Sequence, residues 1–215
     1  MIDASAFKYN LIYSNSEFED ILKGIISCYY SMVSNKIRLP HNDEEAIRDT
    51  MLSKDYLKGY NFKEDHPPLS NYHFDKETSE NKGRADIRIL HINPYISDDT
   101  YYIIECKRLD GNKELNRKYI AEGIIRFTNE KKYPFYNDTA GMIGFVVEKI
   151  DINKNVLSIN ELLKQEFSNI DTEETITEKT IISDFEYSYF SKHKVNNASK
   201  IIYHLMFDFS DNISL

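Results

Sequence analysis

Apolar residues recur along this chain with two different spacings, and each spacing predicts a different type of element. Spacing of three or four positions is typical of an amphipathic helix. It predicts helices over about residues 16–34, 43–57, 113–128 and 157–167. Ser16 and Glu19 have the spacing of a capping box at the start of the first helix. Asn42 or Asp43 can cap the second helix. Residues 59–82 are polar and lack periodicity, which predicts a long irregular connection.

Alternating or continuous apolar segments predict the strands. They lie at about residues 84–91, 100–107, 140–147, 176–182, 184–190 and 201–209. The first two are expected to form a hairpin, joined through Asn93, Pro94 and residues 97–99. The segment 140–147 is apolar throughout, which suits a strand covered on both faces of a sheet. These elements favour an α/β fold with a mixed central β-sheet flanked by helices. The 215 residues are expected to form a single domain.

Composition narrows the class of protein. The chain has no run of about 18 apolar residues, so we expect no membrane span. Its first residues lack the basic and apolar regions of a secretory signal. Cys28 and Cys106 are too few for a disulfide framework or a structural zinc site. We therefore expect a cytoplasmic protein.

Charge is unevenly distributed along the chain. The net charge of −8 argues against a protein that coats nucleic acid non-specifically. Residues 107–132, however, carry eight basic and four acidic side chains, whereas residues 161–186 carry eight acids and two lysines. The basic surplus directly follows the predicted hairpin, where it suits a phosphate backbone. Ordinary surface scatter explains the same distribution equally well.

Three charged residues in the predicted hairpin are the chief candidates for chemistry. Glu105 and Lys107 stand two positions apart on a strand, so they project from one face while Cys106 points away. If the two strands pair, Asp86 reaches the same place. An isolated pair of this kind is often only a cross-strand ion pair. Here, however, the strand is apolar, an acid precedes it on the neighbouring strand, and a basic helix follows it.

Two carboxylates and an ammonium in one place are suited to metal-assisted cleavage of phosphodiesters. Asp86 and Glu105 would be ligands of Mg²⁺ or Mn²⁺, together with the backbone carbonyl of Cys106, because Mg²⁺ prefers oxygen ligands. A separation of more than about 8 Å between the two carboxylates would prevent them from sharing one ion. Lys107 would position the attacking water and stabilise the charge that develops on the phosphate.

A further acid is expected from the start of the second helix. Glu44 shares a helical stripe with Ile47, Arg48 and Met51, so it faces inward more readily than Glu45 does. Acids at a helix start also commonly serve the helix dipole alone, and either glutamate therefore remains possible.

With these residues in view, the chain resembles the PD-(D/E)XK, or restriction-endonuclease-like, nuclease superfamily. Asp86 matches the motif acid, and residues 105–107 match the (D/E)xK element. The acidic helix start at residues 43–49, and segments 119–127 and 140–146, are similar to small bacterial members. The resemblance covers about residues 40–150, and it departs from the motif name in that Ala85 precedes Asp86 where a proline would stand.

The resemblance implies a mixed sheet flanked by helices and Mg²⁺-dependent cleavage of nucleic acid, with DNA as the expected substrate. A catalytically silent binding or assembly module in a larger DNA-processing or defence complex is the alternative. A protein partner or a homodimer is left open in either case.

Other polar residues were assigned lesser roles. Arg117, Lys118 and Arg126 are candidates for phosphate contacts, or else they form a solvated helix face. Tyr119 is expected in the core. His193 and His204 have no second metal ligand at suitable spacing, so a metal site is not predicted there.

Overall fold

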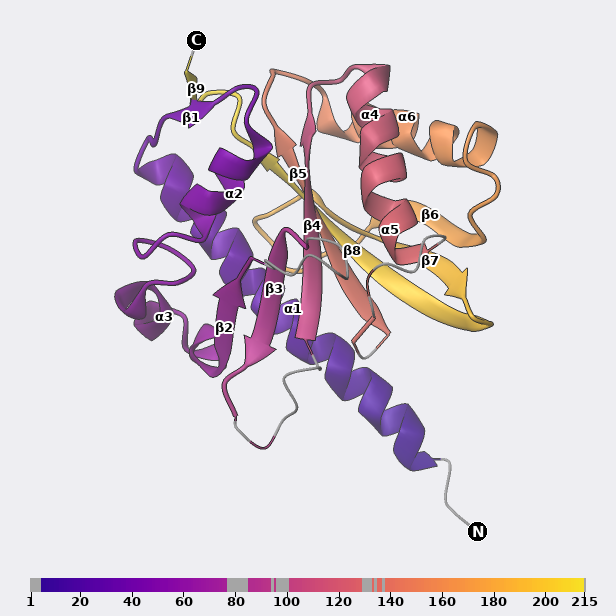
Figure 1. Cartoon of the computed structure of the whole chain (residues 1–215), viewed down its shortest axis with the longest axis horizontal. Coiled ribbons are helices and arrows are strands. Elements are labelled where there is room, and N and C mark those ends of the chain that lie inside the picture. Colours follow the sequence, from indigo (N-terminus) through magenta and orange to yellow (C-terminus); the bar gives the residue numbers. More distant parts are fainter. Residues whose placement is uncertain are drawn as a thin grey trace.

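The computed structural model describes residues 5–76, 85–93, 95, 101–128, 133, 135, 136 and 138–214, with the backbone alone for residues 5–15. Its centre is a seven-stranded mixed sheet in the order β2-β3-β4-β5-β8-β7-β6, and β1 and β9 form a separate short pair (Figure 1). The strands are β1 (Leu39–Pro40), β2 (Tyr72–Asp75), β3 (Ile87–His91), β4 (Tyr101–Leu109), β5 (Thr139–Val146), β6 (Thr172–Glu178), β7 (Ser188–Val195), β8 (Ala198–Asp208) and β9 (Ile213–Ser214).

Strand direction changes across the sheet. The three strands β2, β3 and β4 form an antiparallel meander, while β5 lies parallel to both β4 and β8. The strands β8, β7 and β6 are again antiparallel. Every residue of β5 is buried, as expected for a strand covered on both faces. The predicted mixed sheet flanked by helices is therefore confirmed.

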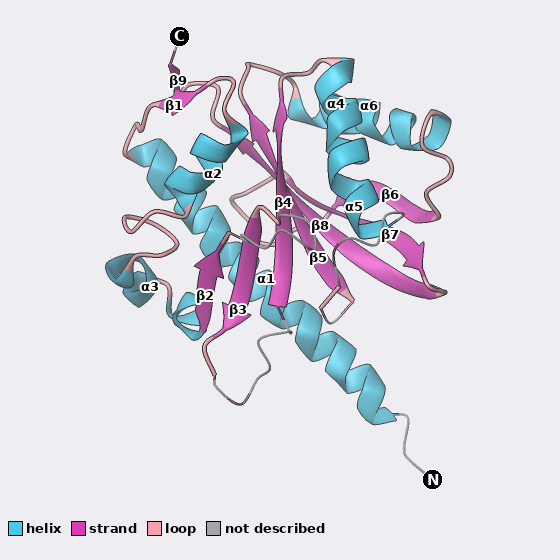
Figure 2. Ribbon diagram, viewed as in Figure 1, coloured by secondary structure: helices cyan, strands magenta, loops and turns pink. Residues whose placement is uncertain are grey.

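Helices cover both faces of this sheet (Figure 2). They are α1 (Ser5–Ser34), α2 (Glu44–Met51), α3 (Tyr60–Asp65), the 3₁₀ helix η1 (Pro67–Asn71), α4 (Lys113–Tyr119), the π-helical turn η2 (Ile120–Ile124), α5 (Ile125–Thr128) and α6 (Ile152–Gln165). On one face, Phe18 and Ile25 of α1 pack in a core with Phe145 and Phe207. On the other face, α4, η2, α5 and α6 pack around Met142 and Met206. Within the described residues, no helix has the length and apolar character needed to span a membrane.

Two predicted helix limits were wrong. The first helix begins at Ser5, so Ser16 lies in its interior and does not form a capping box with Glu19. The second helix ends at Met51 instead of about residue 57, because the N–H of Leu52 bonds back to Arg48 and Thr50 and the chain then turns. Asp43 caps this helix by accepting a hydrogen bond from the N–H of Ala46 at 2.9 Å.

The predicted irregular connection at residues 59–82 was also wrong in part. It contains α3, η1 and the edge strand β2. β2 is only four residues long, with Tyr72 and Phe74 buried, so its alternation is too brief to recognise in the sequence. Residues 77–82, the predicted strand start at residue 84, and the predicted turn residues 94 and 97–99 lie outside the described residues.

The remaining helices and strands were predicted correctly in type, but some begin or end at other residues than predicted. The helix predicted at 157–167 begins earlier, at Ile152, where Asp151 caps it. The strands predicted at 176–182 and 184–190 are β6 and β7, which lie at Thr172–Glu178 and Ser188–Val195. The helix predicted at 113–128 has the expected limits, but it contains the π-helical turn η2.

Candidate active site

Glu105 and Lys107 lie in the middle of β4 and project from the face covered by α4 and α5. The intervening residue, Cys106, belongs to the core on the opposite face. Lys107 Nζ lies 2.9 Å from Glu105 Oε1 and donates to the carbonyl oxygen of Cys106 at 2.7 Å. The side chain of Glu105 is 0% exposed and that of Lys107 is 8% exposed. The period-two spacing of the strand thus places an acid and a base together in a recess.

Asp86 is brought to the same place by the β3–β4 hairpin. Ile87 pairs with Ile104, so Asp86 precedes the paired residues on the side towards Glu105. Asp86 Oδ2 accepts a hydrogen bond from the N–H of Cys106 at 2.9 Å and lies 3.8 Å from Lys107 Nζ. Both carboxylates therefore lie within 3.8 Å of one nitrogen. With these distances at 3.8 and 2.9 Å, the two carboxylate oxygens are less than about 7 Å apart, below the separation of about 8 Å that would prevent them from sharing one ion.

The first residue of α2 supplies the third carboxylate. Glu44 Oε1 accepts from Lys107 Nζ at 3.0 Å, and Glu44 Oε2 accepts from the backbone N–H of Arg108 at 2.8 Å. Glu45 instead points outward, with a side chain that is 59% exposed and lies 3.7 Å from Arg48. Of the two helix glutamates, Glu44 is thus the one that joins the cluster.

Arg126 and Tyr133 lie next to Glu105, on the side of the cluster formed by α5 and the residues after it. Arg126 Nη1 donates to Glu105 Oε1 at 2.6 Å and to the hydroxyl of Tyr133 at 3.0 Å. Arg126 follows the π-helical turn η2, a deviation that occurs frequently at functional sites. Gly123 in this turn packs so closely against β5 that a Cβ there would overlap the side chain of Met142.

Burial sets the protonation of the central pair. Burial, followed by the negative charge of Asp86, raises the pKa of Glu105 to about 8. Burial alone would lower the pKa of Lys107, but the carboxylates of Glu105, Glu44 and Asp86 outweigh it and raise that pKa above its usual value. The ammonium of Lys107 therefore holds its proton firmly, and the pKa of Glu105 lies above its usual range.

A buried arginine fixes the position of Asp86. Arg48, 1% exposed, donates from Nη1 to Asp86 Oδ1 at 2.9 Å and from Nη2 to Asp49 Oδ1 at 2.7 Å. Asp49 in turn accepts from Lys76 at 2.9 Å. Sequence reasoning had placed Arg48 on the inward stripe of its helix without giving it a role, and it had missed Tyr133. The inward stripe was the one signal that pointed to Arg48.

The oxygen atoms of the cluster are of the type that Mg²⁺ binds. Asp86, Glu105 and the Cys106 carbonyl all face Lys107 Nζ, and Glu105 Oε2 is buried without a hydrogen-bond partner. Within the described part of the chain, however, no three His, Cys, Asp or Glu side chains lie close enough together to hold an ion. The ammonium of Lys107 lies at the centre of these oxygens. The donor atoms fit a divalent cation, and binding one would require Lys107 to move aside.

The other predicted phosphate-binding residues lie outside this cluster. Arg117 is exposed and forms a two-point ion pair with Glu166, at 2.7 and 2.9 Å. Lys118, also exposed, pairs with Glu114 at 2.9 Å within α4. Of the three basic residues proposed from the sequence, the structure brings only Arg126 into contact with the site acids.

The histidines of the C-terminal strands form a buried network. Ser191 Oγ lies 2.8 Å from His193 Nε2 and 2.9 Å from His204 Nε2, and His204 Nδ1 lies 2.8 Å from the hydroxyl of Tyr119. Burial lowers the pKa of both histidines, that of His193 to about 4 and that of His204 to about 3. Tyr119 is a core residue, as expected. The network links α4 to β7 and β8 through neutral hydrogen bonds.

Comparison of the chain with protein-family models, with curated proteins and with solved structures gave no match. Functional inference therefore depends on the site geometry and on the motif resemblance described above.

Proposed function

We propose that this protein is a metal-dependent nuclease of the restriction-endonuclease-like type that hydrolyses phosphodiester bonds, with DNA as its substrate. The observation that carries the proposal is the position of Lys107 Nζ, which lies within 3.8 Å of oxygens from Glu44, Asp86 and Glu105. Glu44 begins α2, Asp86 directly precedes β3 and Glu105 lies in β4, whereas a simple surface ion pair involves only two residues. The acid and Glu-x-Lys motif thus forms one recessed cluster beside a basic helix.

The side chains have distinct roles under this proposal. Asp86 and Glu105, with the Cys106 carbonyl, would hold Mg²⁺ or Mn²⁺, which supplies Lewis acidity and activates water when bound. Lys107 donates hydrogen bonds to a non-bridging phosphate oxygen as negative charge builds there. Arg126, which donates to Glu105 at 2.6 Å, stabilises the same negative charge on the phosphate. Glu44 keeps Lys107 in position through its 3.0 Å contact.

Arg48 has a supporting role, because it does not face the substrate. Its contact with Asp86 Oδ1 and the Cys106 N–H on Asp86 Oδ2 hold both oxygens of this carboxylate. A ligand held from two sides is fixed in direction before the cation arrives, which reduces the reorganisation on binding.

The test is cleavage of single- and double-stranded DNA and RNA, with Mg²⁺ and with Mn²⁺, alongside calorimetric titration of Mn²⁺. Asp86→Asn should lose both metal binding and cleavage. Lys107→Met should fall by about 10²–10³-fold in rate while it still binds Mn²⁺, because the ammonium is not a ligand. Protein that neither binds Mn²⁺ nor cuts any substrate would refute the proposal and favour the silent binding module.

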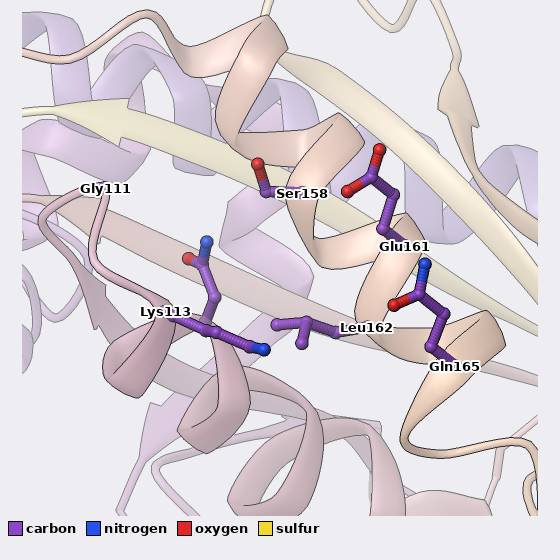
Figure 3. A pocket seen from close by; sticks show the side chains of 7 residues that line it. Gly111, Lys113, Ser158, Glu161, Leu162 and Gln165 are labelled. Carbon is purple, nitrogen blue, oxygen red and sulfur yellow. The ribbon is translucent and has the colours of Figure 1, made fainter.

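Matched controls come from a pocket of about 220 Å³ between α4 and α6, away from the site. Lys113, Ser158 and Glu161 line its walls (Figure 3). Lys113→Met and Glu161→Gln make the same chemical changes away from the cluster. Both variants should retain wild-type metal affinity and cleavage rate.

A further inference from the structure

A recess that is separate from the pocket of Figure 3 adjoins the candidate active site. It has a volume of about 240 Å³ and contains Lys107 in its wall. Its other wall residues include Glu44, Arg108, Leu115, Lys118 and Glu122. Glu44 belongs to α2 and Leu115 and Lys118 to α4, while Figure 1 shows β4 between these two helices. The recess is therefore a gap between α2 and α4 that leads to the Lys107 ammonium.

The chemistry of the recess suits a nucleic-acid backbone. Arg108 and Lys118 bring two positive charges to its wall against the carboxylate of Glu122, while Lys107 and Glu44 pair with each other at 3.0 Å. Leu115 adds an apolar surface, against which a sugar or base can pack. Proteins that bind single strands without regard to sequence follow the backbone with a positively charged groove.

The size and depth of the recess limit which substrates can reach the site. Glu105 is 0% exposed, Lys107 8% and Asp86 13%, so a scissile phosphate must enter the protein surface to contact them. The volume is below the range of about 300–1,000 Å³ that is usual for small-molecule sites, so it admits only a short piece of chain. A DNA duplex is stiff over about 150 base pairs and enters such a gap only after it is bent or opened. A single strand is flexible enough to enter.

We propose that this protein acts on unpaired DNA, with one strand passing between α2 and α4 so that its backbone reaches Lys107. The proposal rests on the proposed nuclease function and specifies its substrate. A duplex would have to be opened locally, and separating and unstacking bases has an energetic cost.

The first experiment compares three DNA substrates of one sequence with Mn²⁺: a single strand, a perfect duplex, and a duplex with an unpaired central loop. The duplex should be cut at least about tenfold more slowly than the single strand, and cuts in the third substrate should lie in the loop. Equal rates on single strand and perfect duplex would overturn the proposal and leave the nuclease function intact.

The second experiment measures binding, so that it also decides the case in which no substrate is cut. Fluorescence anisotropy with Ca²⁺ in place of Mn²⁺ compares the affinity for labelled single strand and duplex. Wild-type protein should prefer the single strand. Leu115→Trp fills the recess and should abolish this preference, whereas Ser158→Trp fills the similar pocket of Figure 3 and should preserve it.

A third variant guards against misfolding of the tryptophan variant. Lys118→Glu reverses one wall charge at an exposed position of α4, and it should weaken single-strand binding at least about tenfold, since each phosphate contact is electrostatic. Absence of single-strand binding by the wild type, or unchanged preference in both Leu115→Trp and Lys118→Glu, would refute passage between α2 and α4.

Discussion

Removal of Arg48 tests whether the site acids depend on this buried guanidinium. In Arg48→Met, Asp86 loses the 2.9 Å partner of Oδ1, while Oδ2 keeps the Cys106 N–H and Lys107 at 3.8 Å, and the side chain is only 13% exposed. Breaking one side of a buried ion pair typically costs 3–5 kcal/mol. Asp49 is 42% exposed and retains Lys76, so it regains water and adds little. We expect a loss of about 3–4 kcal/mol in the free energy of unfolding.

A double-mutant cycle separates this ion pair from lost packing. Asp86→Asn removes the charge that Arg48 compensates, so Arg48→Met should cost less in the Asp86→Asn background. We expect a coupling free energy of about 2 kcal/mol, within the usual range for residues in contact. Urea unfolding followed by circular dichroism suits the protein, because it contains no tryptophan.

An exposed arginine provides the matched control for this cycle. Arg117→Met makes the same arginine-to-methionine change in a surface ion pair with Glu166. It should change the free energy of unfolding far less, since exposed pairs contribute little. A coupling below about 0.5 kcal/mol between Arg48 and Asp86 would refute the claim that Arg48 fixes this carboxylate.

Three further predictions concern other parts of the molecule. Because burial lowers the pKa of His204 to about 3, the unfolded chain binds a proton that the native state lacks between about pH 6.5 and 3. Stability should therefore fall with decreasing pH, by about 1.4 kcal/mol per unit from this residue, and urea unfolding of His204→Gln should show a shallower fall. Gly123→Ala should change the free energy of unfolding by less than about 1 kcal/mol, because its methyl meets the flexible Cε end of Met142 and alanine favours the helix; a fall of more than about 2 kcal/mol in urea unfolding would contradict this. In anisotropy titrations over a range of NaCl, Arg126→Ala should reduce the log–log salt slope of single-stranded DNA binding by about 0.7, whereas Arg117→Ala should leave it unchanged.

Local sequence patterns predicted the centre of the site because its geometry is mostly local. Glu105 and Lys107 stand two positions apart on a strand, and this spacing alone places them on one face. The hairpin then brings Asp86 to them without any distant contact. Glu44 was favoured over Glu45 for the same reason, since helical periodicity fixed its direction relative to Ile47.

The parts that the sequence did not predict depend on contacts between distant segments. Tyr133 stands five positions after the last residue of α5, and only the packed structure places its hydroxyl against Arg126. The four residues of β2 are too few to predict a strand, and its pairing with β3 identifies it. The hydrogen bonds of Ser191 with two histidines likewise need β7 and β8 to be side by side.

The central position of β8 determines when the sheet can close during synthesis on the ribosome. Strand β8 lies between β5 and β7, although it follows both in the chain. Until Asp208 has left the ribosomal tunnel, β5, which is wholly buried in the native fold, presents an unpaired edge to solvent or to a chaperone. Translation that stops before β8 would thus yield a chain that already holds Asp86, Glu105 and Lys107 but lacks the strand that completes their sheet. In such a chain the exposed edge would favour aggregation before the site could form.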